Sequence, residues 1–533
     1  MNDTHVLAQP HASAASRTSF YSIFALILAC GISYVAYALL SDLVDVRHAS
    51  AFAYLLLGGA LLIALGFEFV NGFHDTANAV ATVIYTHSLK PHAAVVWSGA
   101  WNFIGVMVSS GAVAFGIIAL LPVELILQVG SHAGFAMVFA LLSAAIIWNL
   151  GTWYFGLPSS SSHTLIGSII GVGLMNQIVQ QGTDSTSGVD WAQATKIGYS
   201  LLLSPLIGFT CAGLLLLAAK YFVQNPALYR APEGHQPPPF WVRSLLILTC
   251  TGVSFAHGSN DGQKGMGLIM LILIGTVPTA YALNHAVPAS QVQTFVAESR
   301  YVVEVMGKYI PTAKPAAPIR DSRGEITQYL KTRELAPTTL AALQQLTGEV
   351  SREVSRYGTY AMLPEDRQGN IRNDMYLVSE TLRQMDKAGA PQFSAEDTAI
   401  LKSYKKRLDQ ATKFIPVWVK IAVAIALGLG TMVGWKRIVI TVGEKIGKAH
   451  LTYGQGACAE IVAMGTIGAA DAFGLPVSTT HVLSSGVGGT MAANNSGLQW
   501  NTVRNLLLAW VLTLPMSIVL AGGLFWLFRQ VAA

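Results

Sequence analysis

The sequence NGFHDTAN, at residues 71–78, places polar groups inside an otherwise hydrophobic stretch of the chain. A charged aspartate at the centre of a bilayer costs about 2.5–3.5 kcal/mol even on a lenient insertion scale, so Asp75 must face a cavity or a partner. Gly72 lets the backbone leave the helical conformation. We therefore predict a membrane helix that unwinds here, with free amide groups that attract anions and free carbonyl groups that attract cations.

The composition of the whole chain excludes an ordinary water-soluble protein. Of the 533 residues, 52% are hydrophobic and only 11% are charged, whereas an average soluble domain is about 25% charged. A helix needs about 20 apolar residues to cross the hydrocarbon layer. The apolar runs lie near residues 19–41, 51–70, 93–121, 134–155, 197–222, 243–256, 265–283, 414–434, 453–475 and 502–528. We therefore predict an all-α polytopic membrane protein whose solvent is the lipid bilayer.

Two pairs of segments in the chain resemble each other. NGFHDTAN at residues 71–78 aligns with HGSNDGQK at 257–264, and GLPSSSSH at 156–163 aligns with GLPVSTTH at 474–481. Paired motifs of this kind indicate an internal repeat.

The spacing of the motifs supports the repeat. The separation from Asp75 to Pro158 in the first half is much shorter than the separation from Asp261 to Pro476 in the second half. The difference closely matches the length of a polar segment at 284–413, in which Lys and Arg slightly outnumber Asp and Glu. Without that segment the two halves keep the same spacing. We therefore interpret it as a soluble, partly helical insertion in the second repeat.

The repeat and the insertion divide the chain into six parts. We expect an N-terminal tail with an extra transmembrane helix at 1–50, a first repeat at 51–222, a linker at 223–242, the first helix of the second repeat at 243–283, the insertion at 284–413 and the rest of the second repeat at 414–533. The run at 19–41 is too long for a signal peptide and ends in no clear cleavage site. We therefore expect it to be retained.

Basic residues orient the chain in the membrane, because cytoplasmic loops carry an excess of Lys and Arg. One end of the bundle carries Lys90 and the following basic residues: Lys220, Arg230, Arg243, Lys436, Arg437, Lys445, Lys448 and Arg504. The opposite end carries Arg47 and Lys196. The two repeats are then inverted, as in many secondary transporters, and the segment 284–413 falls on the outer side.

The second motif pair places hydroxyl groups at a helix start, because proline favours the first turn of a helix. The hydroxyl-bearing residues are Ser160, Ser161, Ser162, Ser478, Thr479 and Thr480. Backbone amides and hydroxyls that converge on one point suit a tetrahedral oxyanion. Membrane Ser and Thr also pack helices together, but duplication at matched positions favours binding. His163 and His481, which end the runs, have either a structural or a binding role.

Three further ionisable residues lie at membrane depth. Glu68 and Glu460 are candidates for proton relay or are held by neighbouring helices. Lys264 replaces the Asn78 of the first repeat and lies close to Asp261 in sequence. It has two alternative roles: an ion pair with Asp261, or a fixed positive charge at an anion site.

The motifs resemble those of the inorganic phosphate transporter (PiT) family. NGFHDTANA at 71–79 and HGSNDG at 257–262 are similar to its duplicated signature, and PSSSSH at 158–163 and PVSTTH at 476–481 are similar to its hairpin tips. The resemblance runs from about residue 52 to the C-terminus. It implies two inverted repeats with broken helices, two re-entrant helical hairpins, and phosphate held between the repeats.

The resemblance also implies roles for individual residues. The implied substrate-binding residues are Gly72, Asp75, Asn78, Ser160, Ser161, Ser162, Gly258, Asn260, Asp261, Ser478, Thr479 and Thr480. The implied coupling residues are Asp75, Asp261, Lys264, Glu68 and Glu460. Bacterial members similar to this chain are proton symporters of the inner (plasma) membrane that accept phosphate as a complex with a divalent metal. We expect no cofactor and no nucleic-acid partner; metal ligands and a homodimer are left open.

Four alternatives follow from the same residues. The anion could be sulfate, and the coupling ion could be sodium, although the sodium-driven branch of the family usually has Asn at the position of Lys264. A membrane hydrolase would use Ser162 or Thr480 with the adjacent histidine, but neighbours in sequence rarely point at each other, and a nucleophile must reach its base. A passive channel is disfavoured by the repeated broken helices. We therefore expect a transporter and not an enzyme.

Overall fold

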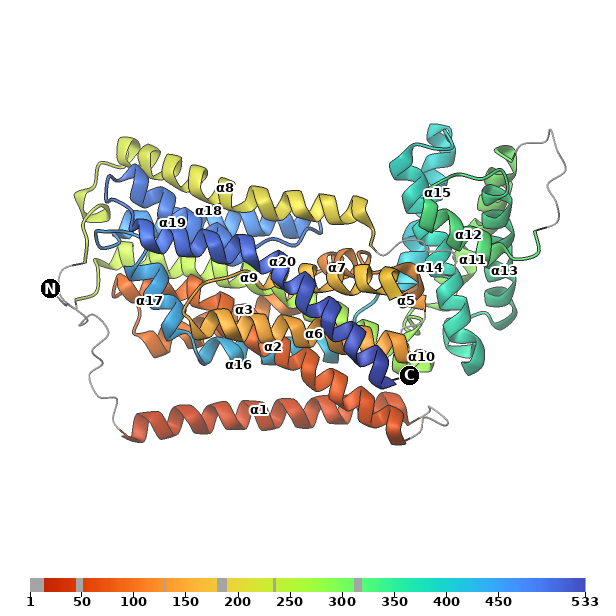
Figure 1. Cartoon of the computed structure of the whole chain (residues 1–533), viewed down its shortest axis with the longest axis horizontal. Coiled ribbons are helices and arrows are strands. Elements are labelled where there is room, and N and C mark those ends of the chain that lie inside the picture. Colours follow the sequence, from red (N-terminus) through yellow and green to blue (C-terminus); the bar gives the residue numbers. More distant parts are fainter. Residues whose placement is uncertain are drawn as a thin grey trace.

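The computed structural model describes residues 14–44, 51–127, 131–179, 189–232, 236–310 and 319–532. Within these ranges the chain is all-helical, and β-structure is limited to one isolated bridge between Gly447 and Leu498. Two bodies are visible in Figure 1: a long bundle, which holds the N- and C-terminal helices, and a smaller group of helices at one end of it. The first body contains the predicted membrane runs.

The helices of the first body are α1 (Ala14–Leu43), α2 (Ala51–Tyr85), α3 (Pro91–Val108), α4 (Ala112–Ile118), α5 (Val123–Leu127), α6 (His132–Tyr154), α7 (Ser161–Val179), α8 (Trp191–Phe222), η1 (Pro226–Leu228), α9 (Phe240–Thr276), α10 (Pro278–Tyr281), α16 (Val417–Met432), α17 (Lys436–Glu444), α18 (Tyr453–Ala472), α19 (Thr479–Ala493) and α20 (Trp500–Ala532). We call this set the membrane bundle. The second body contains α11 (Ala289–Lys308), α12 (Ser322–Thr332), α13 (Thr339–Tyr357), η2 (Tyr360–Met362), α14 (Glu365–Ala388) and α15 (Ala395–Thr412). We call it the outer bundle.

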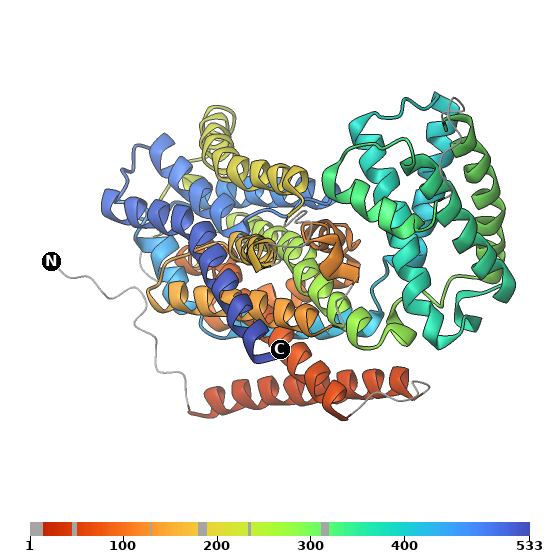
Figure 2. The same cartoon turned by 45° about the vertical axis from the view of Figure 1, so that its right-hand side comes forward.

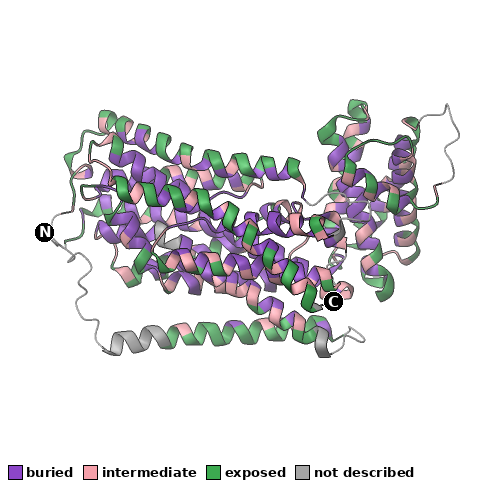
Figure 3. Cartoon of the chain, viewed as in Figure 1, coloured by how far each residue is buried: buried purple, intermediate pink, exposed green. Residues whose placement is uncertain are grey.

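Several helices have the length and composition of membrane spans. Among the described residues there are seven such helices, or up to nine if each of two bent helix pairs forms one span. The bent pairs are α3 with α4, at 75°, and α15 with α16, at 71°. The chain is therefore a multi-pass membrane protein, as the apolar runs predicted. α1 lies along the edge of the bundle and is largely exposed (Figure 3).

The predicted helix breaks are absent, and this part of the prediction is wrong. α2 continues without interruption through residues 71–78, and α9 joins the predicted run 243–256 to most of the run 265–283, whose end forms α10. The backbone amides that follow Gly72 and Gly258 therefore lie inside helices and are not free to bind an anion.

The two glycines allow close packing of helices instead. A Cβ atom on Gly72 would lie 2.2 Å from the carbonyl oxygen of Leu427 in α16, and one on Gly258 would lie 2.2 Å from that of Asn102 in α3. No side chain fits at such distances, so both crossings require glycine. The signature glycines thus bring helices together, and the polar side chains project from intact helices.

Two helical hairpins form where the proline motifs predicted helix starts. α6 and α7 are joined by residues 155–160, and α18 and α19 by residues 473–478. Each connection has a glycine with positive φ, Gly156 at 67° and Gly474 at 64°, a conformation that glycine adopts at no steric cost. The hydroxyl runs lie at the starts of α7 and α19.

The two parts of the membrane bundle are packed into each other. α2 packs on α16 and α3 packs on α9, while α7 packs on α20 and α8 packs on α19. If the repeats are superposed in sequence, α2 corresponds to α9, α3 to α16, α7 to α19 and α8 to α20. Under this correspondence the contact of α2 with α16 becomes the contact of α9 with α3, and the contact of α7 with α20 becomes that of α19 with α8. Each contact thus has an equivalent in which the helix of one repeat is replaced by that of the other.

The outer bundle has a hydrophobic core of its own. Phe295 and Tyr404 stack in this core with ring centroids 5.3 Å apart, among other buried apolar side chains from α11 to α15. The segment is thus more helical than the sequence predicted. Figures 1 and 2 place it beyond one end of the membrane bundle.

The outer bundle is fastened to the loops at that end. Asp190, the N-cap of α8, accepts a hydrogen bond from Arg383 of α14 at 3.1 Å and forms an ion pair with Arg333 at 3.3 Å. Asn373 of α14 donates to the carbonyl oxygen of Leu127 at 3.4 Å. These contacts fix α14 over the membrane bundle.

Candidate functional site

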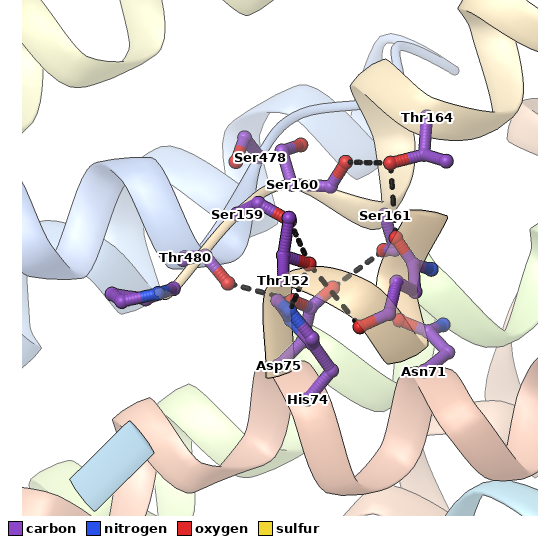
Figure 4. Close-up of polar contacts among 12 residues, drawn as sticks. Asn71, His74, Asp75, Thr152, Ser159, Ser160, Ser161, Thr164, Ser478 and Thr480 are labelled. Atoms are coloured by element: carbon purple, nitrogen blue, oxygen red, sulfur yellow. Dashed lines mark hydrogen bonds and ion pairs between the residues drawn. The ribbon is translucent and has the colours of Figure 1, made fainter. Parts of the chain in front are cut away.

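Asp75 of α2 lies where the two hairpin tips meet. Ser161, at the start of α7, donates its hydroxyl to Oδ2 of Asp75 at 2.5 Å. Thr480, in the first turn of α19, donates to Oδ1 at 2.7 Å. All three side chains are buried, and Figure 4 shows the hydroxyls approaching the carboxylate from different helices. One carboxylate therefore joins α2 to both hairpins.

His74 fixes the position of Asp75. Its Nδ1 lies 3.2 Å from Oδ1 of Asp75, and its Nε2 lies 3.2 Å from Oγ1 of Thr152 in α6. The Thr152 hydroxyl is also 3.0 Å from that of Ser159 in the hairpin connection. This buried chain of polar groups, visible in Figure 4, holds the first hairpin against α2.

A buried ion pair from α9 faces the same point. Nζ of Lys264 lies 2.8 Å from Oδ2 of Asp261, and Nε2 of His257 lies 3.4 Å from the same oxygen. Lys264 also donates to Oγ of Ser161 at 3.3 Å. Ser161 thus links the Asp261–Lys264 pair to Asp75, and the two signature aspartates share one polar cluster.

The cluster has the donor atoms of a cation site, but an ammonium group already lies in it. Single ligand atoms of Asp75, His257 and Asp261 all lie within 4.8 Å of one another. The Lys264 ammonium is in direct contact with Asp261, one of these three groups. A fixed cation therefore neutralises Asp261.

The hairpin tips also bind each other. Ser162 of the first tip donates to the carbonyl oxygen of Val477 in the second, at 2.6 Å. Asn260 of α9 donates to the carbonyl oxygen of Leu475 at 3.0 Å and accepts from the amide of Val477 at 3.4 Å. The Ser162 hydroxyl is thus directed at a backbone carbonyl, which argues against its use as a nucleophile.

Each tip proline is held by the long helix that packs on its hairpin. Trp510 of α20 donates to the carbonyl oxygen of Pro158 at 2.9 Å, and Ser200 of α8 donates to that of Pro476 at 3.0 Å. The rings of His163 and His481 meet with centroids 4.6 Å apart, and His481 stacks on Trp510 at 4.2 Å. The two histidines therefore join the tips by ring contacts.

The remaining hydroxyl residues support the helix starts. Ser478 is the N-cap of α19 and accepts from the amide of His481 at 3.1 Å. Ser160 accepts from the amide of His163 at 3.2 Å in the same way. Side chains that cap a helix satisfy amides that lack an intrahelical partner. Thr479 is buried beside them.

The two membrane glutamates lie at different levels of α2, on either side of this cluster. Glu68 belongs to α2 itself, and Glu460 of α18 contacts α2 at Thr82. Glu68 is two turns before Asp75, fully buried, and abuts Gly265 of α9. Glu460 accepts hydrogen bonds from Thr82 of α2 and Thr249 of α9. Thr82 is two turns beyond Asp75, about 10 Å along the helix axis. Glu460 is therefore held between helices and lies apart from the hairpin tips.

The structure brings together most of the residues singled out from the sequence. Asp75, Asp261, Lys264, Ser161 and Thr480 form one connected cluster. The side chain of Asn78 lies outside the described residues. Gly72 and Gly258 serve helix packing, and Glu460 is remote.

Sequence reasoning missed one half-buried acid near the second tip. Asp471, near the end of α18, accepts from Ser259 at 2.6 Å and from Gln263 at 2.6 Å. It is an acid within the apolar run 453–475, which is the signal that would have found it. Gln263 also accepts from the amide of Val113 at 2.9 Å, and so satisfies the backbone at the bend between α3 and α4.

Fold and site together define a class of protein. The chain is a multi-pass helical membrane protein in which two helical hairpins meet over buried charged groups, an arrangement expected of membrane transporters. Comparison with known proteins makes the assignment specific: residues 71–521 match the model of the phosphate transporter family. The chain belongs to that family.

Curated relatives agree over most of the chain. It is 43% identical over 491 residues to the low-affinity inorganic phosphate transporter PitA of Escherichia coli K12. The alignment covers 89% of this chain and 97% of that relative. It is 42% identical over 493 residues to PitB of the same strain, with the same coverage. A probable low-affinity inorganic phosphate transporter of Bacillus subtilis is 27% identical and covers 88% of this chain and 96% of its own.

One solved structure is also similar. It is described as the sodium-dependent phosphate transporter, has a TM-score of 0.49 and 19% identity, and covers 89% of this chain and 99% of its own. The relatives are named as transporters, which confirms the prediction that the chain is not an enzyme.

Proposed function

We propose that this chain is a secondary active transporter of inorganic phosphate. Membership of the phosphate transporter family and 43% identity to PitA support the substrate. The observation that carries the mechanism is the convergence of Ser161 and Thr480, from opposite hairpins, on Asp75, with the Lys264 ammonium 3.3 Å from Ser161. Hydroxyl donors, a cation and a carboxylate at one point can bind a hydrogen phosphate anion.

The two hydroxyls would exchange partners on binding. Ser161 and Thr480 now donate to Asp75, and in the bound state they would turn toward phosphate oxygens. Asp75 would then accept a hydrogen bond from the P–OH group of hydrogen phosphate, a donor that sulfate lacks at neutral pH. The groups around the site would thus replace the water shell of a tetrahedral anion, and the acceptor carboxylate favours phosphate over the alternative, sulfate.

Inverted repeats would supply the alternation between the two sides. The matched sequence motifs, the matched hairpins and the exchanged helix contacts support a twofold relation between 51–222 and the second repeat, at 243–283 and 414–533. Two hairpins that meet at their tips can close the site from either side in turn. In this scheme the closed interface between the tips includes the hydrogen bond from Ser162 to the carbonyl oxygen of Val477 and the ring contact of His163 with His481.

We place the protein in the bacterial inner membrane with the outer bundle, 284–413, as a soluble insertion on the outer side. α17, which begins with the basic pair Lys436 and Arg437, lies at the other end of the membrane bundle in Figure 1. Two segments that carry predicted cytoplasmic residues are joined where Arg243 donates to the carbonyl oxygen of Ser88 at 2.8 Å. α1, within the N-terminal part at 1–50, is an addition to the repeats. A homodimer stays open.

We propose protons as the coupling ion and a divalent metal–phosphate complex as the transported species. The support for protons is Lys264, whose ammonium takes the place of a mobile cation beside Asp261 at 2.8 Å. The alternative is sodium coupling, in which a bound Na⁺ would neutralise the aspartates. A neutral metal–phosphate complex would enter this buried cluster at a lower desolvation cost than the free anion.

Labelled phosphate uptake into proteoliposomes tests the proposal. The proton and sodium gradients are imposed separately, and sulfate and arsenate are added as competitors. We expect accumulation driven by an inward proton gradient, no stimulation by sodium, competition by arsenate, and no competition by sulfate. Uptake driven by sodium alone would contradict proton coupling, and strong competition by sulfate would contradict the assigned anion.

A further inference from the structure

Two charges break the symmetry between the repeats, and the structure puts them side by side. Aligning Asp75 with Asp261 pairs Glu68 with Ser254 and Asn78 with Lys264. Each repeat therefore has one ionisable group where the other has a neutral side chain. A Cβ on Gly265, the residue after Lys264, would lie 2.3 Å from Cγ of Glu68, so the glutamate packs directly on the backbone beside the lysine.

The three buried carboxylates of this region differ in what stabilises their charge. Asp75 accepts two hydroxyl hydrogen bonds and contacts His74. Asp261 is paired with Lys264. Glu68 is fully buried, accepts a hydrogen bond from the Asn71 side-chain amide at a long 3.4 Å, and otherwise meets the Gly265 backbone. A buried carboxylate with so few donors is far more stable with a proton on it.

The charges that face Glu68 lead to the same conclusion. On α9 the nearby charges are Lys264 and Asp261, with His257 one turn before Asp261. Asp75 and His74 lie about two turns further along α2. On α16, Lys420 points elsewhere and donates to the carbonyl oxygen of Ser109 at 2.7 Å. Three carboxylates, Glu68, Asp75 and Asp261, outnumber the one ammonium group, that of Lys264, in this part of the bundle. This surplus of negative charge disfavours the approach of phosphate oxygens, so a proton on one carboxylate favours binding.

We propose that Glu68 carries the transported proton and that Lys264 stays protonated on Asp261 as a built-in replacement for a second coupling cation. The inference rests on the proposed phosphate transport and names the residue that couples it. One proton from the outer side binds the Glu68 carboxylate and removes one excess negative charge, which lets phosphate bind. After the site opens inward, the same proton leaves to the cytoplasm with phosphate, and Glu68 regains its charge beside Lys264.

The test separates exchange from coupling in proteoliposomes that contain the full-length protein. Glu68→Gln keeps the shape of the side chain and binds no proton in the working range, so proton influx per phosphate should fall by about tenfold or more. Exchange of labelled for unlabelled phosphate without any gradient should continue, because it needs no net proton movement. Proton entry is read with a pH-sensitive dye trapped in the liposomes.

Two further variants make the result specific. Ser254→Ala, at the repeat position that corresponds to Glu68, should keep both exchange and coupling, since the Ser254 side chain bonds to the uncharged side chains of Ser98, at 2.7 Å, and Cys250. Gly265→Ala should weaken coupling without removing any carboxylate, because the added methyl group displaces Glu68. This variant also provides the test if Glu68→Gln does not fold.

The outcomes are distinct. Glu68→Gln with normal proton influx per phosphate would overturn the inference while the proposed function stands. Loss of exchange together with coupling in a folded Glu68→Gln protein, with Gly265→Ala like the wild type, would also overturn it, since Glu68 would then be needed for binding. Wild-type phosphate uptake without any proton influx would contradict the proposed coupling itself.

Discussion

At the scale of single residues, the site is organised by which partner each acid has. Asp75 is bound by hydroxyls from both hairpins, Asp261 by an ammonium group and Glu460 by two threonines. The sequence predicted the two signature aspartates and the hydroxyl runs because matched motifs mark them. It did not predict Asp471 or the links through His74, because those depend on which helices become neighbours.

Asp75→Asn and Asp261→Asn should each strongly lower coupled uptake in a folded protein. Hydrogen bonds to a charged group contribute about 1.5–3 kcal/mol each, so losing the charge of Asp75 should lower uptake by about 10–100-fold. Asp261→Asn leaves the Lys264 ammonium buried without its carboxylate. Proteoliposome uptake measures the effect, and size-exclusion chromatography checks the fold. Full uptake by either variant would remove that residue from the mechanism.

Lys264→Asn restores the residue that the first repeat carries and removes the fixed cation. Asp261 then lies buried without a positive partner, and a mobile cation is the simplest replacement. We expect proton-driven uptake to fall and added sodium to restore part of it. Uptake is measured with each gradient alone. Unchanged rates and unchanged ion dependence would show that Lys264 has no part in coupling.

At the scale of helices, the hairpins were predictable and the intact signature helices were not. Gly-Leu-Pro followed by hydroxyl residues marks a turn and a helix start in both repeats, and α7 and α19 begin at those residues. Gly72 and Gly258 were ambiguous, because glycine serves equally to unwind a helix or to let another helix approach. Only the neighbouring carbonyls of Leu427 and Asn102 distinguish the two uses.

Gly72→Ala tests the packing use directly. The added methyl group would lie 2.2 Å from a backbone oxygen that cannot move alone, so α2 and α16 must separate at a cost of about 1–3 kcal/mol. We expect a clearly lower thermal midpoint in detergent. Gly58→Ala is the matched control on the same helix, since a Cβ there meets no atom within 4 Å. Equal midpoints for the two variants would contradict the packing role.

At the scale of the whole molecule, the outer bundle is held to the membrane bundle by charged contacts. Burial alone would raise the pKa of the Asp190 carboxyl, but the Gln193 amide and the guanidinium groups of Arg333 and Arg383 outweigh it and lower this pKa. Because the folded pKa is below the ordinary value of about 3.9, the stabilisation is complete above that pH and is lost as the pH falls through the lower value.

Docking of the outer bundle should therefore be insensitive to pH between neutral and about 5 and should weaken below about 4. Asp190→Asn should mimic the acid state at neutral pH. Hydrogen exchange of α14 and of the first turn of α8 reports the docking. The control is Asp386→Asn, which removes a solvent-exposed ion pair with Lys402 inside the outer bundle. Equal exchange in the two variants would show that Asp190 does not hold the bundles together.

The exchanged helix contacts have a consequence for how the chain is made. α7 rests on α20 and α2 rests on α16, yet α7 ends at Val179 whereas α20 begins only at Trp500. During synthesis the first hairpin therefore enters the bilayer long before its packing partner, α20, has been translated. The serine-rich tip therefore stays without its packing partner until the C-terminal helices have been synthesised. Chains that end before α20 should be degraded by membrane proteases.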